Sequence, residues 1–197
     1  PMVAANPELA ELAEWVGCDH ALCLAAAAKA RDMAFAGLQF QVSGLLERAE
    51  ASGEQIIDGI PETFIGQQLA HLTAHEIGHS LGLRHNFKSS SIYTLEEVNS
   101  EDFKGVRANS GSVMDYLPTN WNVENGEVQG DFSMIGIGPY DIWAIEYGYT
   151  LGNPDEVLKR VGEPEHVYLT DEDTRGPDPL ARRYDFSADP HEYARSM

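Results

Sequence analysis

Residues 75–85 constrain the fold of this chain more than any other segment. Three histidines, one glutamate and two glycines stand there at fixed offsets, in the run His75-Glu76-Ile77-Gly78-His79-Ser80-Leu81-Gly82-Leu83-Arg84-His85. His75 and His79 are four residues apart, so on a helix their side chains lie on the same face, one turn apart. Two imidazoles in this arrangement can bind one metal ion. The segment therefore predicts a helix that carries two ligands of a metal site.

The third ligand has to come from beyond this helix, because the position one more turn along is Leu83. Gly82 can adopt the positive φ that ends a helix, and the reversed chain would carry His85 back to the metal. Three neutral histidines leave a fourth position for water, which is typical of a catalytic zinc site. Glu76 would lie close enough to that water to accept its proton.

The zinc helix is predicted over about residues 61–82. Pro61 suits its first position, and apolar residues recur at roughly helical spacing up to the glycine. His71 lies one turn before His75, but a metal bound to these two would leave Glu76 and His85 without a role. We therefore interpret His71 as a neighbour of the site or a surface histidine, not as a ligand.

The segment from His75 to His85 resembles the metzincin zinc peptidases, in which a methionine turn follows the third histidine. Ser112-Val113-Met114-Asp115-Tyr116 is similar to that turn. The run Gly138–Tyr149 adds a similarity to a group of large, exported, zinc-dependent metallopeptidases of bacteria. The resemblance covers about residues 61–150. It implies zinc as cofactor, a peptide or protein as substrate, and a secreted, periplasmic or cell-surface location.

The resemblance also assigns roles to single residues. Zinc lowers the pKa of its bound water toward about 7, and Glu76 takes the proton and delivers it to the leaving amine. Tyr116 would bind the oxyanion or cap the resting metal, unless it is an ordinary half-buried tyrosine. Met114 would form an apolar floor under the histidines, a role that is itself packing.

Two features depart from the metzincin pattern. Asn86 and Phe87 follow His85, where many metzincins place Asp or Gly, so the usual partner of the third ligand is not apparent. Residues 1–60 show helical patterns, at Pro7 to Val16 and from Ala21 to about Ala51, and not the sheet that metzincins place before the zinc helix. We therefore interpret the chain as a fragment that lacks an upstream lobe, or as a rearranged version of the fold. Without that lobe, it is expected to bind zinc but cleave weakly.

A mainly α fold is expected, or α+β with one minor hairpin at Asn125-Gly126. Residues 1–162 would form the core, with a methionine turn at 112–116 and a supporting helix at about 139–149. That helix would begin at Pro139 and carry Ile142, Ile145 and Tyr149 on one face.

Residues 163–197 form an acidic, proline-rich extension in this prediction. A short strand is expected from Val167 to Thr170. The acids of the segment could bind Ca²⁺, but no regular loop pattern is present, and a solvated, partly flexible surface is favoured; they are Asp171, Glu172, Asp173, Asp178, Asp185 and Asp189.

Composition excludes some partners. Thirteen basic against 32 acidic residues give a net charge of −19, which argues against binding to nucleic acid or to an anionic membrane. The longest apolar stretch, Ala21 to Ala28, is too short to cross a bilayer. Cys18 and Cys23 are the only cysteines, and both a local disulfide and two free thiols stay open.

Two other functions are compatible with the zinc helix. In a gluzincin-like hydrolase the third ligand would be a downstream carboxylate, for which Glu96, Glu97 and Glu101 are candidates. In a non-catalytic binding module, zinc would only stabilise the fold. Replacing Glu76 with Gln separates the second alternative from a peptidase.

Overall fold

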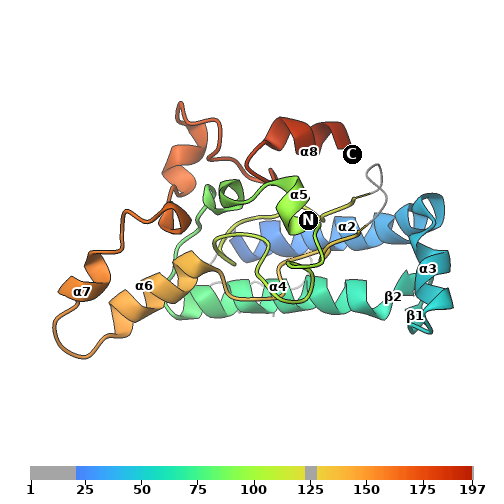
Figure 1. Cartoon of the computed structure of the whole chain (residues 1–197), viewed down its shortest axis with the longest axis horizontal. Helices are drawn as coiled ribbons and strands as arrows, with labels where there is room; N and C mark the ends of the chain where they lie inside the picture. Colours follow the sequence, from blue (N-terminus) through green and yellow to red (C-terminus); the bar gives the residue numbers. More distant parts are fainter. Residues whose placement is uncertain (1–20, 123–127, 197) are drawn as a thin grey trace, which may run out of the picture.

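The computed structural model describes residues 21–122 and 128–196, and two long helices dominate it. α2 (Ala21–Ser43) and α4 (Glu62–Ser80) lie side by side and run in opposite directions (Figure 1). Between them come α3 (Leu45–Ala51), β1 (Ile56–Ile57) and β2 (Ile60–Pro61). The later elements are short: η2 (Ser89–Ile92), α5 (Leu95–Val98), α6 (Pro139–Tyr149), α7 (Asp155–Leu158), η3 (Pro164–His166), η4 (Asp171–Arg175) and α8 (Pro190–Ser196).

The fold is mainly α, as predicted. In the described ranges the β structure consists of one two-stranded antiparallel sheet, in which Ile56 pairs with Pro61. Its turn is Asp58-Gly59, with φ values of 52° and 81°. Positive φ at both central residues is the requirement of a type I′ hairpin turn. The hairpin predicted at Asn125-Gly126 lies outside the described residues.

The long helix predicted from Ala21 to about Ala51 is wrong in one respect. It is interrupted at Gly44, whose φ of +71° is left-handed and incompatible with a continuous helix. The break lets α3 turn away from α2 toward the hairpin (Figure 1). The helix predicted at Pro7 to Val16 lies outside the described residues, as does Cys18, so the state of the cysteines is still open.

α4 ends as its glycine predicts. Gly82 has a φ of +89°, and its amide donates to the carbonyl of His79 at 3.0 Å. The amide of Leu83 reaches back to the carbonyl of Gly78, also at 3.0 Å. This pair of bonds is the Schellman arrangement, which satisfies the last carbonyls and reverses the chain. The range predicted for this helix, about 61–82, compares with Glu62–Ser80 in the structure.

An aromatic cluster fixes α2 against α4. Phe40 of α2 and Phe64 of α4 pack with Trp121 and Phe132, and the ring centroids lie 5.2–5.5 Å apart. Edge-to-face aromatic pairs of this kind add about 0.5–1.5 kcal/mol each to the burial of apolar area. The cluster holds the two long helices at one end and leaves the other end of α4 to the histidines.

The largest apolar core lies over α4 and includes the end of the chain. Its buried members are Leu95, Val98, Phe103, Val113, Met114, Leu117, Met134, Phe186 and Tyr193. Phe186 is only 1% exposed, so the expectation of a solvated, flexible surface is wrong for this part of residues 163–197. Because aromatic side chains bury a large apolar area, two of them are enough to hold the segment on the core. The domain boundary at 162 stays a prediction.

One smaller expectation is also wrong. Val167 to Thr170 does not form a strand, although Leu169 accepts a hydrogen bond from the amide of Phe87. On α6, Ile142 and Tyr149 are 57% and 58% exposed, and the buried side is formed by Tyr140, Asp141 and Trp143. The packing of α6 against η3 and α7 selects that side. Across the described ranges, no helix is both long and apolar enough to cross a membrane.

Candidate metal centre

The three histidines of the motif converge in the structure. One ring nitrogen of each of His75, His79 and His85 lies within 4.8 Å of the others. The Nε2 atoms of all three are buried and have no hydrogen-bond partner. An unpartnered buried nitrogen is costly, and three of them together would be compensated by one bound cation. The donor set therefore fits zinc.

The other nitrogen of each ring is held by an oxygen. His75 Nδ1 lies 2.7 Å from the carbonyl of Val113, and His79 Nδ1 lies 3.0 Å from the carbonyl of Leu83. His85 Nδ1 lies 2.8 Å from Oδ2 of Asp171. A carbonyl or carboxylate oxygen only accepts, so Nδ1 carries the hydrogen and Nε2 keeps its lone pair. Each ring is thus in the tautomer that a metal ligand needs.

Burial also favours the neutral form of His75 and His85. It lowers the pKa of His75 to about 3, and it lowers the pKa of His85 against the opposing effect of Asp171. A neutral imidazole binds a metal without first losing a proton. Protons therefore do not compete strongly with the metal ion for these two rings at neutral pH.

The sequence model of a protein family described as Met-zincin matches residues 58–197, a range that contains all three histidines and Glu76. The chain belongs to the Met-zincin family. It is a metzincin-type zinc metallopeptidase, and the convergence of its three histidines agrees with that membership. No curated protein and no solved structure matches the chain.

Glu76 of this Met-zincin lies on the same helix as two of the histidines. Its Oε1 is buried and has no partner. Burial raises the pKa of Glu76, against the opposing charge of His79. A carboxylate with a raised pKa is a better base near neutral pH than an exposed one.

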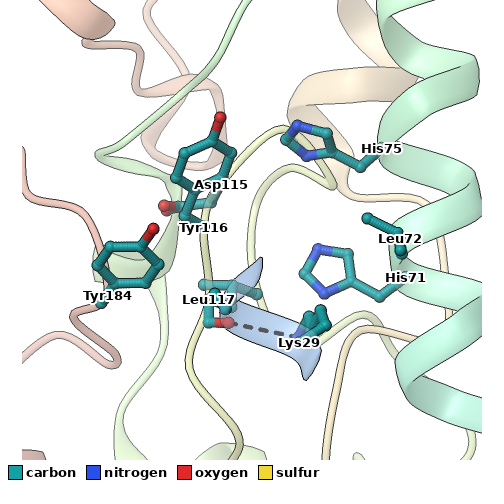
Figure 2. A pocket seen from close by; sticks show the side chains of 9 residues that line it. Lys29, His71, Leu72, His75, Asp115, Tyr116, Leu117 and Tyr184 are labelled. Carbon is teal, nitrogen blue, oxygen red and sulfur yellow. Dashed lines mark hydrogen bonds between the residues drawn. The ribbon is translucent and has the colours of Figure 1, made fainter. Parts of the chain in front are cut away.

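Tyr116 lies next to the histidines. Its ring centroid is 4.7 Å from that of His85 and 5.4 Å from that of His75. Figure 2 shows it facing His75 across a pocket, with Tyr184 beside it. The structure therefore brings Tyr116 to the centre, packed also against Phe87.

Met114 is fully buried and packs against α4 at Gly78, between His75 and His79. A Cβ on Gly78 would overlap the Sδ of Met114, so only glycine allows this contact. The glycine of the motif's Ile-Gly-His segment thus has a packing role that the sequence analysis missed. Gly82 acts separately, at the chain reversal that leads to His85.

His71 is buried at 2% exposure, so it is a neighbour of the site and not a surface histidine. Its Nε2 lies 3.3 Å from the Val113 carbonyl, which also accepts from His75, and its Nδ1 lies 2.9 Å from Ser133 Oγ. Both ring nitrogens are occupied. His71 therefore cannot act as a ligand without breaking these bonds.

The sequence analysis missed Asp171, the partner of His85. Asn86 explains how a residue so far along the chain arrives there: its side chain donates to the Val167 carbonyl at 2.9 Å and accepts from the Leu169 amide at 3.3 Å. These bonds hold the segment that leads into Asp171. Arg183 fixes the other carboxylate oxygen at 2.7 Å. Asn86, the residue after the third ligand, thus helps to hold the carboxylate of Asp171 beside His85.

Asp141 was also missed. Its buried carboxylate accepts from Ser112 Oγ at 2.5 Å and from the amide of Val113 at 2.8 Å. Val113 is the residue whose carbonyl holds His75. Asp141 therefore positions His75 through Val113. The only signal for Asp141 in the sequence was its position in the helix predicted at about 139–149.

The gluzincin-like alternative is not supported by the geometry. Glu96, Glu97 and Glu101 lie outside the group of side chains that converge, as judged over the described residues. Glu97 instead caps α5, where it accepts from the Thr94 amide at 2.8 Å. The downstream carboxylate that reaches a ligand is that of Asp171, and it bonds to Nδ1 of His85 at 2.8 Å.

Proposed function

We propose that this Met-zincin is an endopeptidase that hydrolyses internal bonds of peptides or proteins, with Glu76 as general base and Tyr116 as oxyanion donor. One observation carries the proposal. The Nε2 atoms of His75, His79 and His85 converge, buried and unpartnered, and Oε1 of Glu76, the residue after His75 on the same helix, is also buried and without a partner. Such unmet polar groups are expected where a metal and a reacting water belong.

Zinc, when bound by the three histidines, would act as a Lewis acid that makes water more acidic and polarises the scissile carbonyl. Glu76 is one residue from His75, so its free oxygen can accept the proton of the attacking water and return it to the leaving amine. Its raised pKa supports both transfers, because the base has to hold the proton briefly.

Tyr116 lies on the opposite side of the centre from α4, in contact with His85. A phenol at that position could donate a hydrogen bond to the oxygen on which negative charge develops. Such donors contribute about 10²–10³-fold in rate in other hydrolases. Met114 lies beneath the rings as apolar packing.

The test compares Glu76→Gln with the parent and with Glu62→Gln, an exposed glutamate in the first turn of the same helix. We expect Glu76→Gln to lose hydrolysis of a capped peptide pool and to hold one equivalent of zinc. Glu62→Gln should keep both properties. Mass spectrometry of the products would locate the cleaved bonds and decide whether they are internal.

A parent that binds zinc and cleaves no peptide would favour the alternative of a non-catalytic, zinc-stabilised module. Loss of zinc from Glu76→Gln would also count against a role as base. An exported location is likewise proposed only from the family resemblance, and fractionation of cells that express the gene would test it.

A further inference from the structure

A pocket lies directly beside the metal centre. It is lined by Ala28, Lys29, His71, Leu72, His75, Asp115, Tyr116, Leu117 and Tyr184. Figure 2 shows Lys29 and His71 at one end of this pocket, and His75 facing Tyr116 at the other. Because His75 and Tyr116 belong to both sites, a substrate group in the pocket would lie next to the bond that is cleaved.

Lys29 places a positive charge in this pocket with few partners. Its Nζ donates to the carbonyl of Leu117 at 3.4 Å and to Ser133 Oγ at 3.2 Å, both long distances. No carboxylate of the described residues comes within ion-pair distance of it. The third hydrogen of the ammonium group therefore has no acceptor among residues 21–122 and 128–196.

Asp32, the acid whose charge acts on Lys29, does not form an ion pair with it. Asp32, one turn further along α2, accepts from Thr119 Oγ1 at 3.0 Å and lies 3.7 Å from Arg31. Burial lowers the pKa of Lys29 to about 8, and the charge of Asp32 opposes this only in part. A partly buried ammonium group with long hydrogen bonds and no ion pair is stabilised most by the carboxylate of a bound molecule.

The walls of the pocket would strengthen such a contact. Leu72, Leu117 and the ring of Tyr184 surround the space with apolar groups. Where water is excluded, the attraction between opposite charges is larger than at an exposed surface. The lining also holds Asp115, whose pKa burial raises well above its usual range, and the free volume of about 20 Å³ admits a small group such as a carboxylate and not a whole side chain.

We propose that Lys29 makes this pocket selective for a carboxylate of the substrate, so that the peptidase prefers bonds next to an acidic group. This rests on the proposed function, because it names the substrate class of the same site. The carboxylate can come from an Asp or Glu side chain or from the end of a peptide chain. Lys29 lies outside residues 58–197, so the family match carries no information about it.

The first experiment measures cleavage. The parent, Lys29→Met and Lys29→Glu are incubated with peptides that differ only in Glu, Gln, Leu or Lys at one position, each with an amidated or a free C-terminus. We expect the parent to prefer Glu over its isostere Gln by about tenfold to a hundredfold, the range of a hydrogen-bonded charge. Lys29→Met should bring this ratio close to one, and Lys29→Glu should favour Lys in place of Glu.

The second experiment measures binding without turnover. Zinc-loaded Glu76→Gln is titrated with the same fluorescent peptides, with and without Lys29→Met. A preference for Glu that Lys29→Met removes supports the pocket even if the parent cleaves nothing, in which case only the proposed function fails. A dependence on the free C-terminus alone would assign the carboxylate to the chain end.

Two controls separate specificity from structure. Lys159→Met removes an exposed positive charge on the far side of α7 and should leave the Glu to Gln ratio unchanged. Zinc content of Lys29→Met should equal that of the parent. Equal weakening of all peptides by Lys29→Met, or no preference for Glu in either assay, would overturn the proposal and leave Lys29 as a support between α2 and Leu117.

Discussion

Helix α4 and residues 163–196 contribute to one metal centre in different ways. α4 supplies two ligands and the proposed base from consecutive turns, so their relative positions follow from helix geometry. The C-terminal segment supplies Asp171, which orients the third ligand across a separation of 86 residues. Ligand identity is thus a local property here, and ligand orientation depends on contacts that are distant in sequence.

The same contrast appears in packing. The contact of α4 with Met114 depends on the absence of a side chain at Gly78. The C-terminal segment depends on large aromatic groups, Phe186 and Tyr193, inserted into the core. Four substitutions, ordered by expected effect, test how far the two regions really differ.

The largest effect is expected on the helix side. His79→Ala removes one of three ligands. Loss of a residue that hydrogen-bonds to a ligand typically weakens metal binding about 10–100-fold, and loss of the ligand itself should weaken zinc binding by more than that. Isothermal titration with zinc and metal analysis would measure this. His191→Ala, an exposed histidine of α8, is the control and should bind zinc like the parent. Unchanged affinity in His79→Ala would remove that residue from the centre.

The C-terminal side should give the next largest effect. Asp171→Asn keeps the shape of the side chain but loses the charge that holds His85 Nδ1, so zinc affinity should fall about 10–100-fold. Glu172→Gln is the matched control, because its exposed carboxylate pairs with Arg84 and not with a ligand. Equal affinities for the two variants would mean that His85 is oriented by α4 and its turn alone.

Packing beneath the ligands should respond to Gly78→Ala. The new methyl group would overlap Met114 Sδ, and overpacking of a core costs about 1–3 kcal/mol in the free energy of unfolding. Gly66→Ala, on the same helix with nothing near its Cβ position, should be neutral or more stable by up to about 1 kcal/mol. Denaturant unfolding of both would compare them. If the two variants are equally stable, Met114 has room to move away.

The smallest effect concerns Asp185, whose pKa burial raises to about 7. The folded state then keeps its proton between pH 3.8 and 7 while the unfolded state has lost it, so this group makes stability fall as pH rises through that window. Asp185→Asn should stabilise the protein by about 1 kcal/mol at pH 8 and by much less at pH 4. The full pKa shift would correspond to about 4 kcal/mol, which solvent screening reduces because the side chain is only partly buried.

Unfolding curves at both pH values would measure this difference. The control is Asp102→Asn, which replaces an exposed acid and should change stability little at either pH. A gain from Asp185→Asn that is the same at pH 4 and pH 8 would show that the carboxyl is solvated in the folded state.

Much of the centre could be predicted from the sequence. The helical spacing of His75 and His79 and the glycine at 82 depend on backbone geometry within a few residues, which any chain with this motif shares. Asn86 was visible as a departure, but its consequence was not, because its partners Val167 and Leu169 lie in another part of the chain. The buried side of α6 was not predicted either, since periodicity does not say which neighbour covers a helix.

By itself, the sequence determined the zinc helix, its end at Gly82, the mainly α fold and the family to which the chain belongs. Tertiary structure alone decided that Asp171 holds His85, that Asp141 holds Val113, and that Lys29 enters the pocket beside His75. The reason is physical. Helix spacing and positive φ are properties of adjacent residues, whereas a hydrogen bond across the fold exists only after the aromatic clusters have brought distant segments into contact.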